Sequence, residues 1–345
     1  MKLGVMLGYW GFGQTAADQL ALTKTAEELN YDSVWTAEAY GSDAATVLAW
    51  LAAATTRIKL GSAIFQIPGR SAAMTAMTAA TIDNLSGGRM LLGLGTSGPQ
   101  VSEGWHGVRF AKQLQRTREY VAVVRMALAH QKVELHGETI ELPLPDGPGK
   151  VLKLTLRPVQ ERIPIYLAAL GPKNVALAGE IADGWLPVWF SPEHTAALRG
   201  PLEEGATRAG RTLAEFRICP TVNVMIHDDL EVARNAMRPM LALYVGGMGS
   251  REQNFYNRLV ASYGFEREAL EVQELYLSGR KSEAMLALPD AMIDAVCIAG
   301  PRDRARERIK AFRDAGVETL IVSPMAFDLA ERTEQLRLIA ELARE

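Results

Sequence analysis

The chain has 345 residues, of which 48% are hydrophobic and 22% charged, a composition typical of a globular protein with a full core. Its formal net charge is −3 and its basic residues form no stripe, which argues against nucleic acid as a partner. No apolar run approaches the ~18 residues that cross a membrane, the first apolar run is too short for a signal peptide, and there are only two cysteines. We therefore expect a cytoplasmic protein without a membrane segment.

Short apolar runs alternate with longer helical patterns along most of the chain, which is typical of parallel α/β proteins. Strands are expected at 3–7, 33–36, 58–64, 89–94, 165–168, 183–187, 216–224 and 319–322. Helices are expected at about 15–29, 44–55, 71–85, 172–181, 230–244, 302–315 and 329–343, with another that contains Tyr120 and Leu128. Eight parallel strands in one chain close most naturally into a (β/α)8 TIM barrel. An open, doubly wound sheet is the alternative fold.

Two segments interrupt this alternation. Residues 132–161 combine two stretches of alternating polar and apolar residues with prolines between them, which predicts an excursion that contains a hairpin. Residues 246–288 show only helical patterns and predict a helical insertion, which would form part of a lid over the pocket. We therefore expect a single domain over residues 1–345 with these two additions.

A glycine tract follows the fourth expected strand. Gly93, Gly95 and Gly98 fit the G-x-G-x-x-G pattern, but a dinucleotide-binding unit also needs a helix that begins at the tract and an acidic residue roughly 20 residues later. Residues 99–107 are too glycine-rich and irregular to predict a packing helix, and the acidic residue is missing. We interpret the tract, with Thr96 and Ser97, as a loop of low bulk that lets a flat ligand approach closely.

A second candidate for ligand binding follows the fifth expected strand. Gly171 frees the backbone there, Pro172 suits the first turn of a helix, and Lys173 adds a positive charge. The free N–H groups of such a turn, which includes Asn174 and follows Ala169, could hold a phosphate. An ordinary connection between a strand and a helix is the alternative.

Polar and aromatic side chains also cluster where strands are expected to end. Glu38 lies just past the second strand and could bind a cofactor ring or substrate, or brace its loop. His106 is the one histidine expected near the rim, where it could transfer a proton near neutral pH or brace its loop. Tyr9, Trp105 and Trp189 could line a pocket for a planar cofactor, although for each residue taken alone packing is the simpler interpretation.

Other kinds of catalytic centre have no support in the sequence. No group of His, Cys, Asp and Glu has the spacing of metal ligands, so we expect no metal. The motifs of serine hydrolases are missing as well.

Several of these tracts resemble the bacterial-luciferase-like family. The resemblance rests on residues 83–89 (Asp-Asn-Leu-Ser-Gly-Gly-Arg), which lead into 92–95, on 182–185 (Ala-Asp-Gly-Trp), and on the order of elements over almost the whole chain. Residues 102–107 and 171–174 resemble the branch of oxidoreductases that depend on the deazaflavin coenzyme F420, which includes methylenetetrahydromethanopterin reductase.

This resemblance implies a (β/α)8 barrel with insertions, usually a homodimer, that binds coenzyme F420 or FMN. It implies a cofactor ring across the third and fourth strands, a phosphate near 171–174, and a non-prolyl cis peptide near Ala63 and Ile64. Members of the branch commonly have Asp-His after the second strand, whereas this chain has Glu38 and Ala39. The carboxylate is retained but the imidazole is missing, so His106 would have to act from another loop.

The function expected from these observations is hydride transfer between C5 of coenzyme F420 and a small organic substrate. An FMN-dependent monooxygenase that uses reduced flavin and oxygen is the first alternative. A barrel that only stores or carries a cofactor is the second. The sequence does not identify the substrate.

Overall fold

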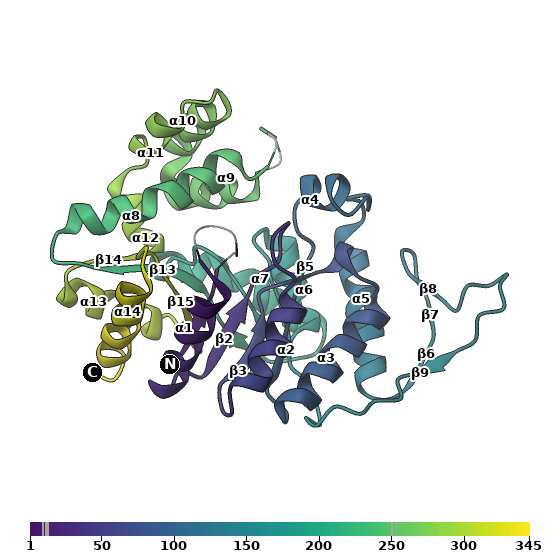
Figure 1. Ribbon diagram of the computed structural model, residues 1–345. Helices are drawn as coiled ribbons and strands as arrows, with labels where there is room; N and C mark the ends of the chain where they lie inside the picture. Colours follow the sequence, from purple (N-terminus) through teal and green to yellow (C-terminus); the bar gives the residue numbers. More distant parts are fainter. Residues whose placement is uncertain (9, 11–13, 250, 253) are drawn as a thin grey trace.

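The computed structural model describes residues 1–8, 10, 14–249, 251–252 and 254–345, and Figure 1 shows its strands in the middle of the molecule with helices around them. The strands of the main sheet are β1 (Lys2–Met6), β2 (Ser33–Thr36), β3 (Lys59–Ser62), β4 (Phe65–Gln66), β5 (Met90–Gly95), β10 (Ile165–Leu167), β11 (Gly184–Trp185), β12 (Arg217–Ile218), β13 (Thr221–Ile226), β14 (Ile298–Gly300) and β15 (Thr319–Pro324). Their order is β12-β11-β10-β5-β3-β2-β1-β15-β13-β14, with β4 paired to β5.

The ring closes through β12 and β13, which are two halves of one strand. The N–H of Cys219 donates to the carbonyl of Trp185 (2.9 Å) on one side, and the N–H of Ile321 donates to the carbonyl of Pro220 (2.9 Å) on the other. Pro220 has no N–H of its own, which breaks the ladder at this point. The predicted eight-stranded barrel is thus confirmed, and the open sheet is wrong. The short strand β14, which pairs with the end of β13, was not predicted.

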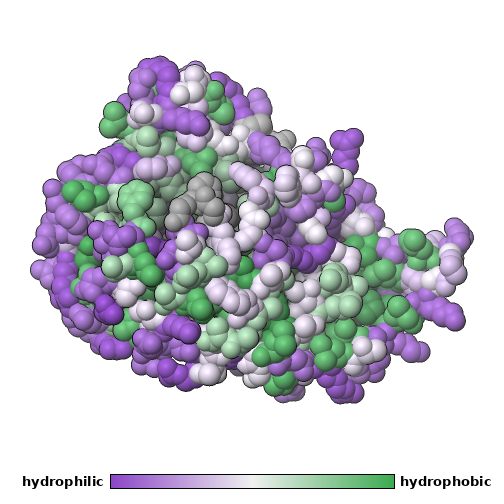
Figure 2. All heavy atoms as spheres, viewed as in Figure 1, coloured by the Kyte–Doolittle hydropathy of each residue, from purple (hydrophilic) through white to green (hydrophobic). Residues whose placement is uncertain are grey.

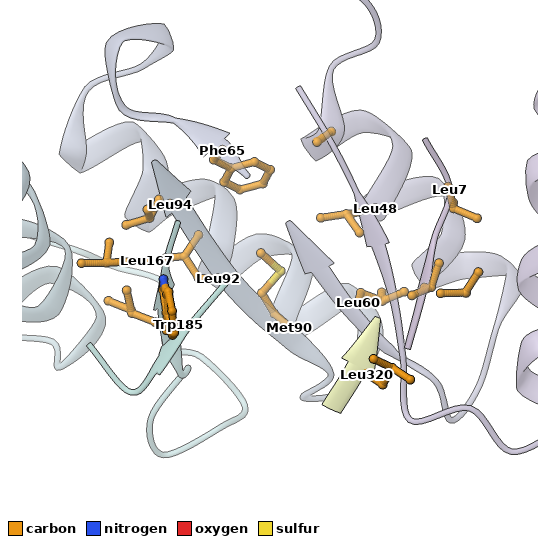
Figure 3. Close-up of a cluster of buried hydrophobic side chains, with 14 of the residues drawn as sticks. Leu7, Leu48, Leu60, Phe65, Met90, Leu92, Leu94, Leu167, Trp185 and Leu320 are labelled. Carbon is orange, nitrogen blue, oxygen red and sulfur yellow. The ribbon is translucent and has the colours of Figure 1, made fainter. Parts of the chain in front are cut away.

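Helices cover the outside of the barrel. They are α1 (Ala16–Glu28), α2 (Ala44–Ala54), α3 (Ala72–Ser86), α5 (Gln113–Leu128), α6 (Pro172–Ile181), α7 (Thr195–Arg208), α13 (Arg302–Asp314) and α14 (Leu329–Leu342). The sequence did not predict α7, because Gly200 and Pro201 interrupt its helical pattern. Between strands and helices lies the main core, part of which Figure 3 shows around Leu60, Met90 and Leu92.

Two aromatic rings fill the inside of the barrel. Trp35 of β2 and Tyr166 of β10 meet edge to face, with ring centroids 5.6 Å apart. Glycines opposite the rings provide the space, because a Cβ at Gly61 would lie 2.2 Å from the Trp35 ring and one at Gly184 would lie 2.4 Å from the Tyr166 ring. The barrel is therefore closed in its middle, and a ligand can enter only at an end.

The helical insertion rises from one side of the barrel, at the upper left of Figure 1. It contains α8 (Leu230–Ala242), η3 (Leu243–Gly247), α9 (Phe255–Val260), η4 (Ala261–Phe265), α10 (Glu266–Leu277), α11 (Lys281–Leu286) and α12 (Asp290–Val296). These helices enclose a separate hydrophobic cluster that includes Met237, Val245 and Val272. The short helix α4 (Pro99–Gly104) rises from the same side of the barrel as this insertion.

A short helix follows the glycine tract. Residues 99–107 were expected to contain no packing helix, and α4, which begins at Pro99, is a short helix that the sequence did not predict. Proline suits the first turn of a helix, which explains its start. With six residues α4 is too short to pack along a sheet, and α5, which begins at Gln113, does so instead.

Residues 83–89, one of the tracts that resemble the family, lie at the end of the barrel opposite to the glycine tract, where they stabilise the fold. Arg89 donates to the hydroxyl of Thr55 (2.8 Å) and to the carbonyl of Ile58 (2.7 Å), which joins three consecutive units of the barrel. Asp83 accepts the N–H groups of Val159 (2.8 Å) and Gln160 (2.9 Å). These contacts brace the end of the barrel that is remote from the glycine tract.

Residues 132–161 form an arm that projects from the barrel at the right of Figure 1. It contains two antiparallel ladders, β6 (Lys132–Val133) with β9 (Leu152–Lys153) and β7 (Leu135–His136) with β8 (Glu141–Leu142). Glu119 of α5 anchors it by accepting the N–H groups of Glu138 (2.7 Å), Thr139 (2.8 Å) and Ile140 (2.9 Å). Burial opposes the charged form, but these bonds and those from the side chains of Thr139 and Gln115 lower the pKa of Glu119 to about 2.

We expect Glu119→Gln to lower the free energy of unfolding at pH 7 by roughly 2–3 kcal/mol, because three backbone N–H groups of the arm lose a buried charged acceptor. The pKa of Glu119 is lower in the folded protein, so its contribution is complete above pH 5 and is lost as the pH falls toward 2. Denaturant melts of both proteins between pH 7 and pH 3 test this. The two stabilities should converge on acidification, and a constant difference would contradict the prediction.

Candidate active site

The C-terminal ends of β3, β5 and β10 form a floor with little side-chain bulk. The peptide between Ala63 and Ile64, just after β3, is cis, as the family resemblance implied. Gly95 lies against this bulge, because a Cβ there would be 2.4 Å from Cδ1 of Ile64 and 3.4 Å from Cβ of Ala168. Ala168 is exposed, and Ala63 and Ile64 are half-buried, so a flat ring could rest on this surface.

The predicted phosphate turn continues from this floor. Gly171 caps α6, its carbonyl accepts the N–H groups of Asn174 and Val175 (3.0 Å each), and Pro172 has no N–H. The N–H of Lys173 has no hydrogen-bond partner among the described residues, and its side chain is exposed. A Cβ at Gly171 would meet nothing within 4 Å, so the N-terminus of α6 is open to an anion.

Neighbouring residues hold this turn and add hydroxyl groups. Nε1 of Trp185 donates to the carbonyl of Ala169 (2.8 Å), which ties the turn to β11. Thr96 and Ser97, next to Gly95, are half-buried, and Ser97 has a φ of +58°. In the chain they lie between Gly95 of the floor and the start of α4 at Pro99.

Glu38 lies in the outer layer of the barrel. Its oxygens accept both terminal nitrogens of Arg70 (2.8 and 2.7 Å) and the N–H of Gln66 (3.1 Å) and Ala44 (3.2 Å). Burial alone would lower the pKa of Arg70, but the hydrogen bonds and charge of Glu38 and the charge of Asp43 raise it. Glu38 therefore joins the loops after β2 and β4 and has no free lone pair directed at the floor.

His106 reaches the same region from the loop after α4. Its Nε2 lies 3.2 Å from Oε1 of Gln66, and Nε2 of Gln66 donates to the carbonyl of Ala39 (2.8 Å). Because the amide oxygen can only accept, the ring must carry its proton on Nε2. Nδ1 of His106 then has a free lone pair and no partner among the described residues. The side chain of Gln66 thus connects His106 to Ala39, the position at which the family resemblance implied a histidine.

The three aromatic residues predicted to line the pocket differ in their placement. Trp105 is 66% exposed at the end of α4. Trp189 is buried, and its ring meets Tyr244 and Tyr256 edge to face. Its backbone carbonyl accepts a hydrogen bond from the hydroxyl of Tyr263 (2.9 Å), so Trp189 anchors the helical insertion. Tyr9 lies outside the described residues.

The structure adds two polar residues that the sequence did not single out. Asn223 of β13 and Ser323 of β15 are register partners and are half-buried. Their neighbours Val222 and Val322 belong to the outer core, so strand alternation directs Asn223 and Ser323 toward the barrel axis. In the sequence, each of these residues is a single polar residue within a run of apolar residues, which is the signal that could have identified it.

Two negative findings apply to the part of the chain that the structure describes. No group of three or more His, Cys, Asp and Glu side chains could hold a metal ion. None of the helices in the same residues is long and apolar enough to cross a membrane.

Comparison with known proteins agrees with this geometry. The family described as luciferase-like monooxygenase matches residues 1–319. The "Putative coenzyme F420-dependent oxidoreductase Rv3520c" of Mycobacterium tuberculosis is 44% identical over 349 residues, 99% of each chain. The 5,10-methylenetetrahydromethanopterin reductase of Archaeoglobus fulgidus is 30% identical over 88% of this chain and 89% of its own.

A solved structure shares the whole fold. The coenzyme F420 dependent tetrahydromethanopterin reductase from Methanopyrus kandleri superposes with a TM-score of 0.82 at 24% identity, over 99% of this chain and 97% of its own. The closed barrel, the cis bulge and the sequence match lead to one conclusion. This chain belongs to the luciferase-like monooxygenase family.

Proposed function

We propose that this protein is a coenzyme F420-dependent oxidoreductase that transfers hydride between the cofactor and a small organic substrate. The observation that carries the proposal is one continuous surface, in which the floor of Ala63, Ile64 and Gly95 leads into the open turn at Gly171. The 44% identical relative has coenzyme F420 in its name, which supports the choice of cofactor.

The residues present fit a deazaflavin. Ala63, Ile64 and Gly95 would support the ring, and the turn from Ala169 to Asn174 would hold the phosphate, with Lys173 adding charge. When bound, the cofactor would supply hydride chemistry at C5. The chain itself would orient the substrate, exclude water and manage the proton.

His106 is the proposed acid and base. The lone pair on Nδ1 can accept a proton from a substrate hydroxyl, and the protonated ring can return it in the reverse reaction. Glu38 acts indirectly, because it fixes Gln66 through the backbone and Gln66 fixes the tautomer of His106. We propose that Trp105 contributes to the substrate pocket and that Trp189 supports it from behind.

Titration with both cofactors tests the proposal. Micromolar binding of coenzyme F420, followed by fluorescence, is expected, with FMN bound much more weakly. An FMN-dependent monooxygenase remains the second candidate because the family description names monooxygenases. Tight binding of FMN without binding of coenzyme F420 would favour that candidate.

Gly95→Val is expected to raise the Kd for coenzyme F420 about 10- to 100-fold. Even a Cβ at this position lies 2.4 Å from Cδ1 of Ile64, so a branched side chain must push Ile64 into the space above the floor. Fluorescence titration gives the Kd, and a thermal melt checks that the variant is folded. A folded variant with unchanged Kd would show that the ring binds elsewhere.

We also propose a homodimer. The exposed face of α3 carries Met74, Met77 and Leu85, and Asp83 ties its end to the arm, which adds Leu144 and Leu152. In Figure 2, hydrophobic residues gather at the lower right, where Figure 1 places α2, α3 and the arm. Such an apolar surface is typical of an interface between subunits.

Met77→Asp is expected to shift the protein from dimer to monomer at micromolar concentration, because two buried carboxylates would face an apolar partner. Sedimentation velocity measures the shift. Leu277→Asp, on an exposed position of α10, is the control and should leave the mass unchanged. A wild-type monomer would contradict the proposal.

A reducing, cytoplasmic location is part of the same proposal. Cys219 and Cys297 are unpaired and buried, and burial raises the pKa of Cys297 to about 12. Thiols in this state are protected from oxidation and do not form a disulfide framework.

A further inference from the structure

Exposed aromatic side chains are confined to one end of the barrel. Among the described residues, the exposed aromatics are Tyr40 (63%), Trp105 (66%) and Phe327 (97%). Tyr40 follows β2, Trp105 lies at the end of α4 after β5, and Phe327 follows β15. All three therefore belong to loops at the C-terminal ends of strands, the end that carries the floor.

Among the described residues, the side chains that strand alternation directs toward the barrel axis at this end carry no charge. Strand alternation directs the following described residues there: Ala63, Ala168, Asn223, Met225, Ser323 and Met325. Met225 and Met325 also pack against the core of the helical insertion. The nearby ions Glu38 and Arg70 neutralise each other and lie in the outer layer. A ligand above the floor would thus meet apolar surface and neutral hydrogen-bonding groups.

The helical insertion reaches over the same end. Phe255 of α9 contacts Phe110, in the loop after α4, with ring centroids 6.5 Å apart. Figure 1 shows α4 and the insertion rising on the same side of the barrel. Phe255 and Phe110 thus place an aromatic side chain of the insertion next to one of the loop after α4 at this end, which suits contact with the apolar part of a ligand.

We infer that the substrate is an uncharged molecule with an extended apolar body and one polar reacting group. The apolar body would lie against Trp105, Phe327 and the methionines, and Asn223 or Ser323 would bind a neutral polar group. Covering an exposed phenylalanine removes apolar surface from water, which makes Phe327 a favourable contact for such a ligand. This inference rests on the proposed hydride-transfer function at the same site.

The test uses the full-length enzyme loaded with coenzyme F420 and the methyl ketones butanone, hexanone and octanone as probes. Isothermal titration should show Kd falling roughly two- to fourfold for each added CH2 group. Glucose 6-phosphate, an anionic probe, should not bind. Phe327→Ser and Trp105→Ser should each flatten the dependence of Kd on ketone chain length, with the largest loss of affinity for octanone.

Leu286→Ser is the matched control, because Leu286 is 76% exposed but lies on α11 rather than on a loop at a strand end. Leu286→Ser should keep the wild-type dependence of Kd on ketone chain length. A Kd that does not change with ketone chain length in the wild type, or tight binding of glucose 6-phosphate, would overturn the inference. So would a change of sedimentation in Phe327→Ser without a change in ketone binding, because Phe327 would then belong to a protein interface. A failure of the proposed function is distinguished at the earlier step, where coenzyme F420 itself would not bind.

Discussion

Replacing His106 with alanine is expected to lower kcat about 10²- to 10⁴-fold and to leave the Kd for coenzyme F420 unchanged. The range is typical for the loss of a positioned general acid or base. Nε2 of the ring is engaged with Gln66, so Nδ1 is the atom available for proton transfer. Stopped-flow measurement of cofactor absorbance gives the rate of hydride transfer once a substrate is known.

The tautomer of His106 can be measured without a substrate. Long-range nitrogen–proton NMR spectra of histidine-labelled protein should show the proton on Nε2 of His106, and Gln66→Leu should give a mixture of tautomers. The signal is assigned by its loss in His106→Ala. His227→Ala, which changes an exposed histidine, is the control for activity. Wild-type kcat in His106→Ala would remove His106 from the mechanism, whereas an Nδ1 proton in the wild type would contradict both the role of Gln66 and the use of Nδ1 as the base.

Periodicity in the sequence was sufficient to predict the barrel, because eight buried strands and most of the covering helices leave strong apolar patterns. The details that were missed have local physical causes. The strand at 216–224 is divided at Pro220, and β14 contains only three residues. Helix α7 is stabilised by close contact with α6, since Gly205 fits against the carbonyl of Ala176. A contact between helices leaves no signal in either helix alone.

The candidate site shows a different limit. The sequence located Glu38 and His106 near the rim, but the direction of each side chain depends on its partners. Glu38 continues the outward side of β2 after Val34 and Thr36. There it contacts Arg70, which lies 32 positions later in the chain. His106 is joined to Ala39 through Gln66, a residue that no motif marked. Both connections span loops from different strands, so only the folded structure reveals them.

Glu38→Ala is expected to lower the free energy of unfolding by about 3 kcal/mol, the second large effect we predict. Arg70 is largely buried beneath this carboxylate and over the ring of Phe65, and without Glu38 it keeps only the exposed Asp43 as an ionic partner. Breaking one partner of a buried pair leaves an uncompensated charge, which costs more than the pair contributes. Denaturant melts at pH 7 measure the change.

A double-mutant cycle measures how strongly Glu38 and Arg70 stabilise each other, and a further variant tests whether Glu38 transfers a proton. Arg70→Met alone leaves Glu38 without its main partner and should also destabilise the protein. The double variant Glu38→Ala with Arg70→Met should lose less stability than the sum of the two single losses.

Glu38→Gln keeps the shape of the side chain but removes its charge. If Glu38 only positions Gln66 and Arg70, Glu38→Gln lowers the melting temperature and reduces kcat about tenfold at most. If Glu38 itself transfers a proton, Glu38→Gln keeps the melting temperature and loses kcat by more than a hundredfold. The hydrogen bonds that occupy both of its oxygens favour the first result.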